Sequence, residues 1–324
     1  MDFEITHVTD YTYANAAAEA YLETRLSPPE LPTQTIGRWR LKIEPKVKTS
    51  SYTDYFGNRV DFFSLPYRHR SLTIATRAEV RTQRVERPTA ALEVSIEEAR
   101  QIFADSITET FDYLQPTDIV LKGREALQWA HRYLRGAAPL GEALENLNRA
   151  VYQTFAYASG ATTNSTPLHE IWKNKRGVCQ DFAHIMLSVL RTAGLPSRYI
   201  CGYIEAVAPP SASADNELPG RGSSRTLVGA IATHAWVEVL VPGMTWVALD
   251  PTNDQWCGER HVTVSRGRDF RDTTPVRGTF KGSGKQNMKV KVFMRRKEVR
   301  PAPRPAVEGS SAGSPAERAA QVAN

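Results

Sequence analysis

The chain has 324 residues, of which 41% are hydrophobic and 23% charged, so it is long enough for two ordinary globular domains. Its three cysteines provide no disulfide framework, and residues 1–5 have neither the basic nor the apolar stretch of a signal peptide. No uninterrupted apolar run approaches membrane-spanning length. We therefore expect a protein of the reducing cytoplasm that does not enter the membrane.

The net charge of +6 is concentrated near the end of the chain, because residues 281–304 carry nine Lys or Arg against the single Glu298. This strand-like stretch could contact an acidic partner, but we interpret it as a solvated charged strand. No nucleic-acid motif accompanies it, so no nucleic-acid partner is expected.

Residues 1–85 alternate between apolar and polar positions, as in Phe3, Ile5 and His7, which is typical of strands with one buried face. Gly57-Asn58 between two aromatic and apolar runs indicates a hairpin. We predict an antiparallel β-sandwich without catalytic residues, whose role is structural or in docking.

The pattern becomes helical after the sandwich. Residues 86–139 are predicted as a helical connector, with one helix beginning at Ser95 and another over 125–133. A helix over 142–155 opens a catalytic core assigned to 140–298. Within it, residues 207–225 are rich in Pro, Ser, Ala and Gly and are expected to form a loop insertion, which is either a lid or specificity loop bordering the cleft or a passive surface insertion. Residues 299–324 have the composition of a disordered tail.

Cys179 is predicted to lie in the first turn of a helix. From Val178 to about Thr192 the apolar residues follow helical spacing, with Cys179, Ala183, Met186 and Leu190 on one face. Gly177 allows the chain to turn sharply just before the helix. The unpaired backbone N–H groups and the dipole at a helix start favour a negatively charged sulfur.

A β-hairpin is predicted to carry a histidine and an aspartate. Its strands are 235–241 and 245–249, with the turn at Pro242-Gly243. Pairing symmetric about Pro242 places Leu240 opposite Met244, Glu238 opposite Trp246, and His234 opposite Asp250. The even separation puts His234 and Asp250 on the same side of the sheet, within reach of a hydrogen bond. Spacing alone does not bring Cys179 to them.

Each of these three residues has an ordinary structural interpretation when it is considered alone. A cysteine in an apolar helix is usually a small core residue, and a histidine before an apolar strand is usually structural. Together, Cys179, His234 and Asp250 supply a nucleophile, a base and an orienting acid, which favours catalysis through a thioester.

Neighbouring residues are weaker candidates. Gln180 is a candidate oxyanion ligand, and Trp236 and Trp246 share the predicted face of His234, where they could wall an acyl tunnel or simply pack in the core. His184 lies about 140° around the helix from Cys179 and is expected to pack away from the sulfur. Asp181 is expected to complement the helix dipole.

No metal or cofactor site is predicted. Cys257 and His261 have a spacing compatible with zinc, but no second ligand pair accompanies them. Gly220-Arg221-Gly222 lacks the Lys-Ser/Thr of a phosphate-binding loop.

These segments resemble the transglutaminase-like superfamily. The resemblance is carried by Gly177-Val178-Cys179, His234-Ala235-Trp236 and Asp250-Pro251-Thr252, with flanking similarity at Tyr157, 160–163, 195–199 and 202–203. Residues 12–13, 25–28 and 54–58 resemble the amino-terminal region of its bacterial branch, and 267–275 its carboxy-terminal end, so the likeness covers about residues 1–294. It implies an α+β fold, an antiparallel β-sandwich followed by a papain-like core, with Cys179 as nucleophile, His234 as base and Asp250 as orienter.

The expected function is thiol-dependent acyl transfer from an amide, with a peptide or amide substrate. Hydrolysis is favoured, since no calcium loop, secretion signal or disulfide framework suggests an extracellular cross-linker. Transfer to a primary amine is the alternative outcome. A non-catalytic scaffold, an arylamine acetyltransferase with a coenzyme A pocket, and a peptide-N-glycanase, which would need paired Cys-x-x-Cys ligands, are the rival interpretations. The sequence does not predict the oligomeric state.

Overall fold

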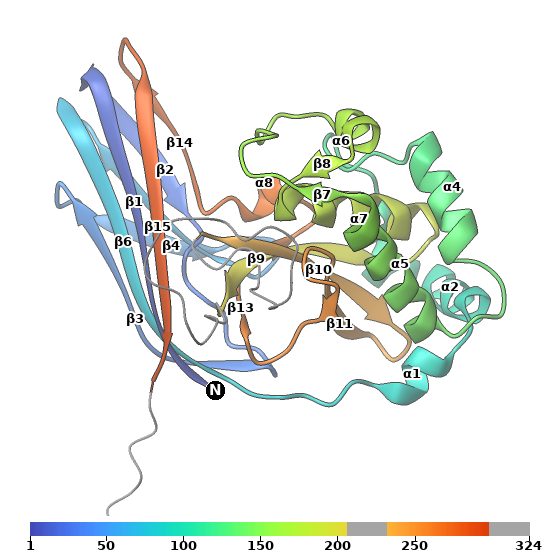
Figure 1. Cartoon of the computed structure of the whole chain (residues 1–324). Helices are drawn as coiled ribbons and strands as arrows, with labels where there is room; N and C mark the ends of the chain where they lie inside the picture. The colour runs from blue at the N-terminus through green and yellow to red at the C-terminus, as the bar shows by residue number, and fades with distance from the viewer. Residues whose placement is uncertain (206–231, 298–324) are drawn as a thin grey trace, which may run out of the picture.

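The computed structural model describes residues 1–205 and 232–297, which form a β-sandwich beside an α+β core (Figure 1). The loop expected at 207–225 and the tail expected at 299–324 lie outside the described residues. Among the helices in the described ranges, none is long and apolar enough to cross a membrane.

Two antiparallel four-stranded sheets make the sandwich, one in the order β15-β1-β6-β3 and the other in the order β14-β2-β5-β4. Alternating apolar residues on these strands meet between the sheets, among them Tyr11, Leu22, Phe63, Leu72 and Ile74. The strands are β1 (Asp2–Ala17), β2 (Glu19–Thr24), β3 (Gln34–Glu44), β4 (Thr49–Thr53), β5 (Arg59–Leu65), β6 (His69–Thr82), β14 (Val276–Lys281) and β15 (Gln286–Arg296).

The last two strands belong to the sandwich, which corrects the prediction that 140–298 form the catalytic core. β14 pairs with β2, and β15 pairs with β1 along most of its length (Figure 1). The reason lies in the alternation along β15: Val292 is buried against the core, whereas its neighbours Lys291 and Phe293 are exposed. The alternation can be read from the sequence, but the sheet that the strand joins cannot.

The core domain is built on a five-stranded antiparallel sheet in the order β12-β11-β10-β9-β13. Its strands are β9 (Ser197–Ile204), β10 (His234–Val241), β11 (Thr245–Asp250), β12 (Gln255–Trp256) and β13 (His261–Gly267), and a two-stranded parallel pair joins β7 (Ala156–Tyr157) to β8 (Arg176–Gly177). The helices are α1 (Thr89–Glu93), α2 (Ile96–Asp105), α3 (Ile107–Leu114), α4 (Arg124–Tyr133), α5 (Leu140–Thr154), α6 (Leu168–Asn174), α7 (Cys179–Thr192) and α8 (Phe270–Thr273).

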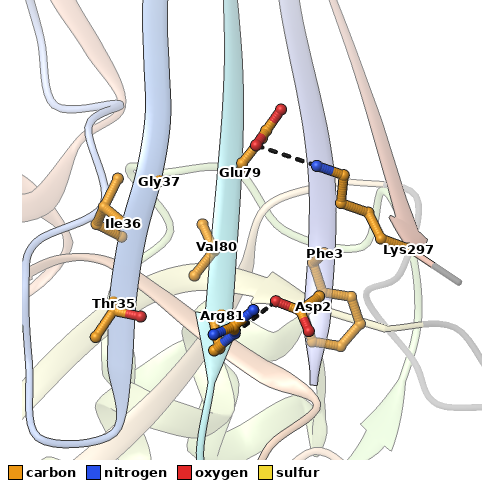
Figure 2. A pocket seen from close by; sticks show the side chains of 9 residues that line it. All are labelled: Asp2, Phe3, Thr35, Ile36, Gly37, Glu79, Val80, Arg81 and Lys297. Carbon is orange, nitrogen blue, oxygen red and sulfur yellow. Dashed lines mark hydrogen bonds and ion pairs between the residues drawn. The ribbon is translucent and has the colours of Figure 1, made fainter. Parts of the chain in front are cut away.

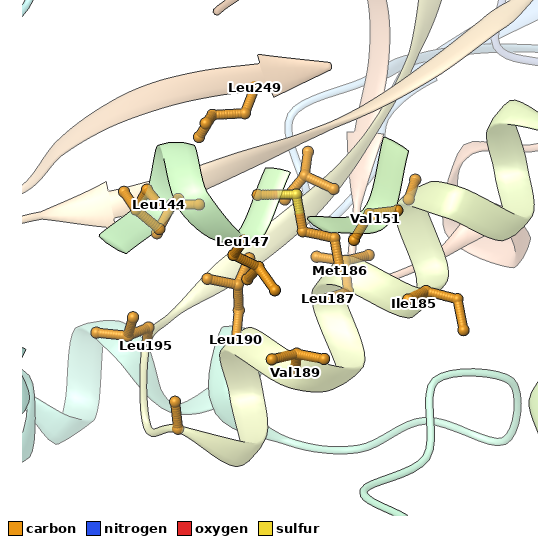
Figure 3. Packing of buried hydrophobic residues seen from close by; sticks show 14 of the residues in the cluster. Leu144, Leu147, Val151, Ile185, Met186, Leu187, Val189, Leu190, Leu195 and Leu249 are labelled. Carbon is orange, nitrogen blue, oxygen red and sulfur yellow. The ribbon is translucent and has the colours of Figure 1, made fainter. Parts of the chain in front are cut away.

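Helix α7 runs through the middle of the core. It packs against β10 and β9 on one side and against α5 and α4 on others, so Phe182, Ile185, Leu187 and Val189 are buried as well as the predicted face (Figure 3). Burial of one such side chain contributes roughly 1.5–3 kcal/mol, which makes α7 a rigid support for the residue that begins it. The helices of the predicted connector share this same apolar core, since Leu92, Ile96 and Phe103 lie in it.

The hairpin of β10 and β11 has a different register from the predicted one. Leu240 pairs with Trp246 and Val237 with Leu249, so the hairpin is symmetric about Gly243 rather than Pro242. Gly243 and Met244 both adopt positive φ, and glycine takes that conformation at little cost, which sets the centre of the turn. A shift of two residues leaves the faces unchanged, so His234 and Asp250 still share a side, in diagonal rather than directly opposite positions.

The sandwich is joined to the core through β13, an edge strand, and through Tyr203 of β9, whose hydroxyl lies 2.9 Å from Nδ1 of His7. Phe3, Ile5 and Val80 of the sandwich share an apolar cluster with Tyr203 and Val262 of the core sheet. Side-chain amides of the sandwich add polar contacts along β13.

Candidate active site

Cys179 is the first residue of α7, where the sequence pattern placed it, and only 9% of its surface is exposed. Asp181 fixes this helix start, because its Oδ2 accepts hydrogen bonds from the backbone N–H of Val178 (2.8 Å) and from the hydroxyl of Thr162 (2.6 Å). A Cβ at Gly177 would lie 2.6 Å from that same oxygen, so a larger residue does not fit. Asp181 therefore caps the helix as well as complementing its dipole.

His234 and Asp250 form a buried hydrogen-bonded pair. His234 begins β10 and Asp250 ends β11, and Nε2 of His234 lies 2.8 Å from Oδ2 of Asp250. Both side chains are fully buried, so the pair is shielded from solvent. The hydrogen bond that the sequence spacing predicted is present despite the shifted register.

Hydrogen-bond donors surround the Asp250 carboxylate. Oδ2 also accepts from the side-chain amide of Asn253 (2.7 Å) and from Nε2 of His261 (3.3 Å), and Oδ1 accepts from the backbone N–H groups of Thr252 (3.0 Å) and Asn253 (3.3 Å). Burial alone would raise the pKa of Asp250, but the charge and hydrogen bond of His234, followed by those of His261, hold it well below its usual value. Asp250 is therefore a carboxylate in the folded protein.

Cys179 and His234 are electrostatically coupled. Burial lowers the pKa of His234, but the charge and hydrogen bond of Asp250, together with those of Cys179, outweigh it and raise that pKa to about 10. Nδ1 of His234 is buried without a hydrogen bond of ordinary geometry to any described residue. With Nε2 held by Asp250, Nδ1 is the nitrogen left to exchange a proton with the thiol. This arrangement leaves one imidazole nitrogen free to act on the thiol.

His261 is a site residue that sequence reasoning missed, since it was considered only as a zinc ligand. It begins β13, is buried, and contacts Asp250 by hydrogen bond and Trp236 edge-on with ring centroids 5.3 Å apart. Its one sequence signal is that, like His234, it immediately precedes an apolar strand. The described residues contain no group of three or more His, Cys, Asp or Glu arranged to hold a metal ion.

The two predicted tryptophans do not wall a common tunnel. Trp236 packs beside His234, with ring centroids 6.0 Å apart. Trp246 lies toward the turn end of the hairpin, where it meets Tyr113 edge-on at 5.0 Å and carries the Arg198 guanidinium over its ring at 4.0 Å. Trp246 thus packs at the edge of the core, away from Asp250.

Gln180 and His184 occupy different environments on α7. Gln180 is half-buried in the first turn beside Cys179, and its role toward an oxyanion stays a prediction. His184 is buried against Tyr199, and its Nε2 accepts the backbone N–H of Phe270. Burial, followed by the charge of Arg191, lowers the pKa of His184 to about 3, so it is a neutral packing residue.

Tyr157 lies near Cys179, close enough for the charge of Cys179 to act on its phenol. Its backbone pairs with Gly177 through β7 and β8, and its ring meets Phe182 edge-on at 6.4 Å. Burial, then the charges of Cys179 and Asp181, raise the pKa of Tyr157 to about 12, so the phenol remains a proton donor. In the sequence it was noticed only as part of the family resemblance.

A hollow of about 310 Å³ on the sandwich is not part of this site (Figure 2). It is lined from β1, β3 and β6 and by Lys297, with no residue from α7, β10 or β11. Its charges are paired across the opening, Lys297 with Glu79 at 3.1 Å and Arg81 with Asp2 at 2.7 Å. Those cations are already neutralised by their partners.

Comparison with known proteins agrees with the fold. Residues 3–81 match the bacterial transglutaminase-like N-terminal region, and residues 127–251 match the transglutaminase-like superfamily. An uncharacterized protein of Mycobacterium tuberculosis is 34% identical over 289 residues, which cover 85% of this chain and 86% of that protein. The chain belongs to the transglutaminase-like superfamily.

One further sequence match to this transglutaminase-like protein is only partial, and one structural match has low sequence identity. A protein-glutamine gamma-glutamyltransferase of Pseudomonas aeruginosa is 32% identical over 108 residues, which are 33% of this chain and 14% of that enzyme. A crystal structure of a candidate cysteine protease from Cytophaga hutchinsonii superimposes with a TM-score of 0.70 at 19% identity and covers 92% of both chains. That similarity extends over both domains and concerns the fold alone.

Proposed function

We propose that this transglutaminase-like protein is an acyl-transfer enzyme in which Cys179 attacks an amide carbonyl, His234 moves the protons and Asp250 orients His234. The observation that carries the proposal is the buried hydrogen bond from Nε2 of His234 to Asp250, which leaves Nδ1 to act on a thiol at a helix start. A nucleophile, base and orienter in this relation are the requirements of thioester chemistry.

The reaction has two halves. The sulfur of Cys179 bonds to the carbonyl carbon, the carbonyl oxygen takes the negative charge, and N–H groups of the first turn of α7 stabilise it, with Gln180 as a side-chain candidate. The C–N bond then breaks as Nδ1 of His234 gives its proton to the leaving amine. In the second half an acceptor gives a proton to His234 and attacks the thioester, which breaks the C–S bond and restores the thiolate.

Water is the acceptor we favour. A cross-linking enzyme must bind an amine and keep water from the thioester, and the sequence carries no calcium loop or disulfide framework that suggests an extracellular cross-linker. Transfer to a primary amine is the second candidate. It is favoured by the match over 108 residues to the protein-glutamine gamma-glutamyltransferase.

A non-catalytic scaffold is the rival from another class. A scaffold has no need to hold a carboxylate and an imidazole together out of water, an arrangement that is costly unless every donor and acceptor is matched. The matched donors around Asp250 are therefore more consistent with catalysis.

The test is turnover with and without an amine. The protein is incubated with labelled glutamine-containing and acyl peptides, with and without a primary amine at millimolar concentration, and products are identified by mass spectrometry. We expect hydrolysed or deamidated products in both cases and none with Cys179→Ala. Dominant amine adducts would assign the protein to amine transfer, and equal turnover by Cys179→Ala would refute the thioester mechanism.

A further inference from the structure

His261 and His234 both donate to the same oxygen of Asp250. Nε2 of His234 lies 2.8 Å from Oδ2 and Nε2 of His261 lies 3.3 Å from it. The backbone N–H of Gly258 points to Nδ1 of His261 at 3.3 Å, so this nitrogen accepts and the ring proton is on Nε2. In this tautomer His261 is a donor to Asp250.

This second donor has two physical effects on Asp250. It fixes the rotation of the carboxylate, since Oδ2 is held from two directions, and it stabilises the negative charge that His234 needs opposite it. The ring of His261 is itself held by the edge-on contact with Trp236. Asp250 also acts on the half-buried Cys257, whose pKa is raised well above its usual value by desolvation, then by the charges of Asp250 and Glu238, so the thiol adds no charge.

The strand that carries His261 is held by the sandwich. The Gln34 side chain donates to the Thr263 carbonyl and accepts the Thr263 N–H, both at 2.9 Å. Asn58 forms the same two-way contact with Arg266 at 2.8 and 2.9 Å. The Thr82 hydroxyl donates to the Glu259 carbonyl at 2.7 Å.

These contacts replace a missing strand neighbour. β13 is an edge of its sheet, with β9 on one side only, and each amide satisfies the donor and the acceptor that a neighbouring strand would satisfy. Glu259 and Thr263 each lie two residues from His261. The sandwich thus fixes the backbone on both sides of this histidine.

We infer that His261 is a positioning residue for Asp250, and that the β-sandwich is a structural part of the active site because it anchors the strand carrying His261. This inference rests on the proposed function and adds to it a role for the amino-terminal domain. The sandwich acts through β13, and it need not contact the substrate.

The experiment measures the rate at which iodoacetamide alkylates Cys179 as a function of pH, which requires no substrate. His261→Leu removes the donor, while His261→Gln keeps an N–H donor at nearly the position of Nε2. With His261→Leu we expect the acid limb of the profile to move up by about one pH unit, a tenfold fall in rate at about pH 5.5. His261→Gln should recover most of this rate.

The role of the sandwich is tested by Gln34→Ala, which leaves all residues around Asp250 in place. Gln83→Ala is the matched control, since Gln83 is exposed and donates to Pro32 within the sandwich, without contact to β13. We expect Gln34→Ala to shift the profile in the same direction as His261→Leu, by roughly threefold in rate, a fraction of a pKa unit. Gln83→Ala should match the wild type.

Folding is monitored in the same samples, because buried Cys201 becomes alkylated only if the core opens. Folded His261→Leu and His261→Gln proteins that both keep the wild-type profile would overturn the positioning role. If His261→Leu does not fold, the other two variants decide. A wild-type profile in Gln34→Ala would overturn the role of the sandwich. A Cys179 alkylation rate in His261→Gln as low as that of an unrelated exposed thiol would show that a donor at this position does not restore the activity of the thiol. A wild-type Cys179 with no enhanced reactivity would instead refute the proposed function itself.

Discussion

The Asp250 carboxylate is held in place by hydrogen-bond donors from several parts of the chain. Its oxygens accept from His234, His261, Asn253 and the backbone after it. The partners Thr252 and Asn253 are sequence neighbours, so a turn after Asp250 could be expected. His261 could not, because its proximity depends on the pairing of β13 with β9 across the sheet.

Substitutions at the three candidate residues should differ in size. Cys179→Ala and His234→Ala remove the nucleophile or the base and should each lower kcat by about 10⁶-fold. Asp250→Asn keeps the shape but favours the wrong tautomer of His234, so we expect a smaller loss of about 10⁴-fold. Steady-state kinetics on any turned-over peptide checks this order; Asp250→Asn falling below His234→Ala would contradict it.

The buried pair should also make stability depend on pH. Asp250 and Cys179 outweigh burial and raise the pKa of His234 from its ordinary value of 6.5 to about 10, so the contribution of His234 to stability is complete below about pH 6.5 and is lost as the pH rises through about 10. Asp250 has a lowered pKa, so its contribution is present above about pH 4 and is lost as the pH falls.

Thermal unfolding of the wild type and of His234→Gln across this range measures the effect. The wild-type advantage in Tm should be greatest between about pH 4 and pH 6.5 and should shrink toward about pH 10, with about 2–4 °C for each kcal/mol of stability. An advantage that grows as the pH rises would show that His234 is not held protonated by Asp250 and Cys179.

At the scale of elements, the helix and the hairpin supply the site, and the two were predictable to different degrees. Helical spacing alone placed Cys179 at the start of α7. The even sequence separation of His234 and Asp250 correctly predicted that they lie on one side of the sheet, because side chains alternate between the two faces along any strand. The register differed because the turn is centred where Gly243 and Met244 adopt positive φ, a choice that Pro242-Gly243 does not specify.

The start of α7 should be sensitive to a single methyl group. In Gly177→Ala the new Cβ would lie 2.6 Å from Oδ2 and 2.7 Å from Cβ of Asp181, so the cap must move. We expect a loss of about 1–3 kcal/mol in stability and slower alkylation of Cys179. Gly37→Ala is the matched control, since its nearest neighbour would be 3.5 Å away. Equal effects of the two substitutions on Cys179 would contradict this account of the cap.

In the whole molecule, the last described strands of the chain belong to its first domain. β14 and β15 complete the sheets that contain β2 and β1, so the sandwich is built from segments on both sides of the core in the sequence. The sequence predicted the sandwich and its alternating faces, yet not these last strands, because strand partners distant in sequence leave no local pattern. For the same reason, the contacts of Gln34 and Asn58 with β13 could not be predicted from the sequence.

Adjacent residues on β15 test its place in the sandwich. Val292 faces the apolar cluster with Phe3 and Ile5, whereas Lys291 is exposed. Val292→Asp should therefore cost about 2–4 kcal/mol through burial of an unpaired charge, while Lys291→Asp should change stability by less than about 1 kcal/mol. Urea unfolding of both variants compares them, and equal destabilisation would place β15 outside the sandwich.

Activation of the Cys179 thiol by His234 underlies the whole proposed mechanism. It is tested most directly by alkylation with iodoacetamide at about pH 5.5, read by peptide mass spectrometry, in the wild type and in His234→Ala. We expect stoichiometric labelling of Cys179 in the wild type, no labelling of Cys201 or Cys257, and at least about a tenfold slower reaction of Cys179 in His234→Ala. A Cys179 that stays unmodified, or that reacts equally fast without His234, would contradict it.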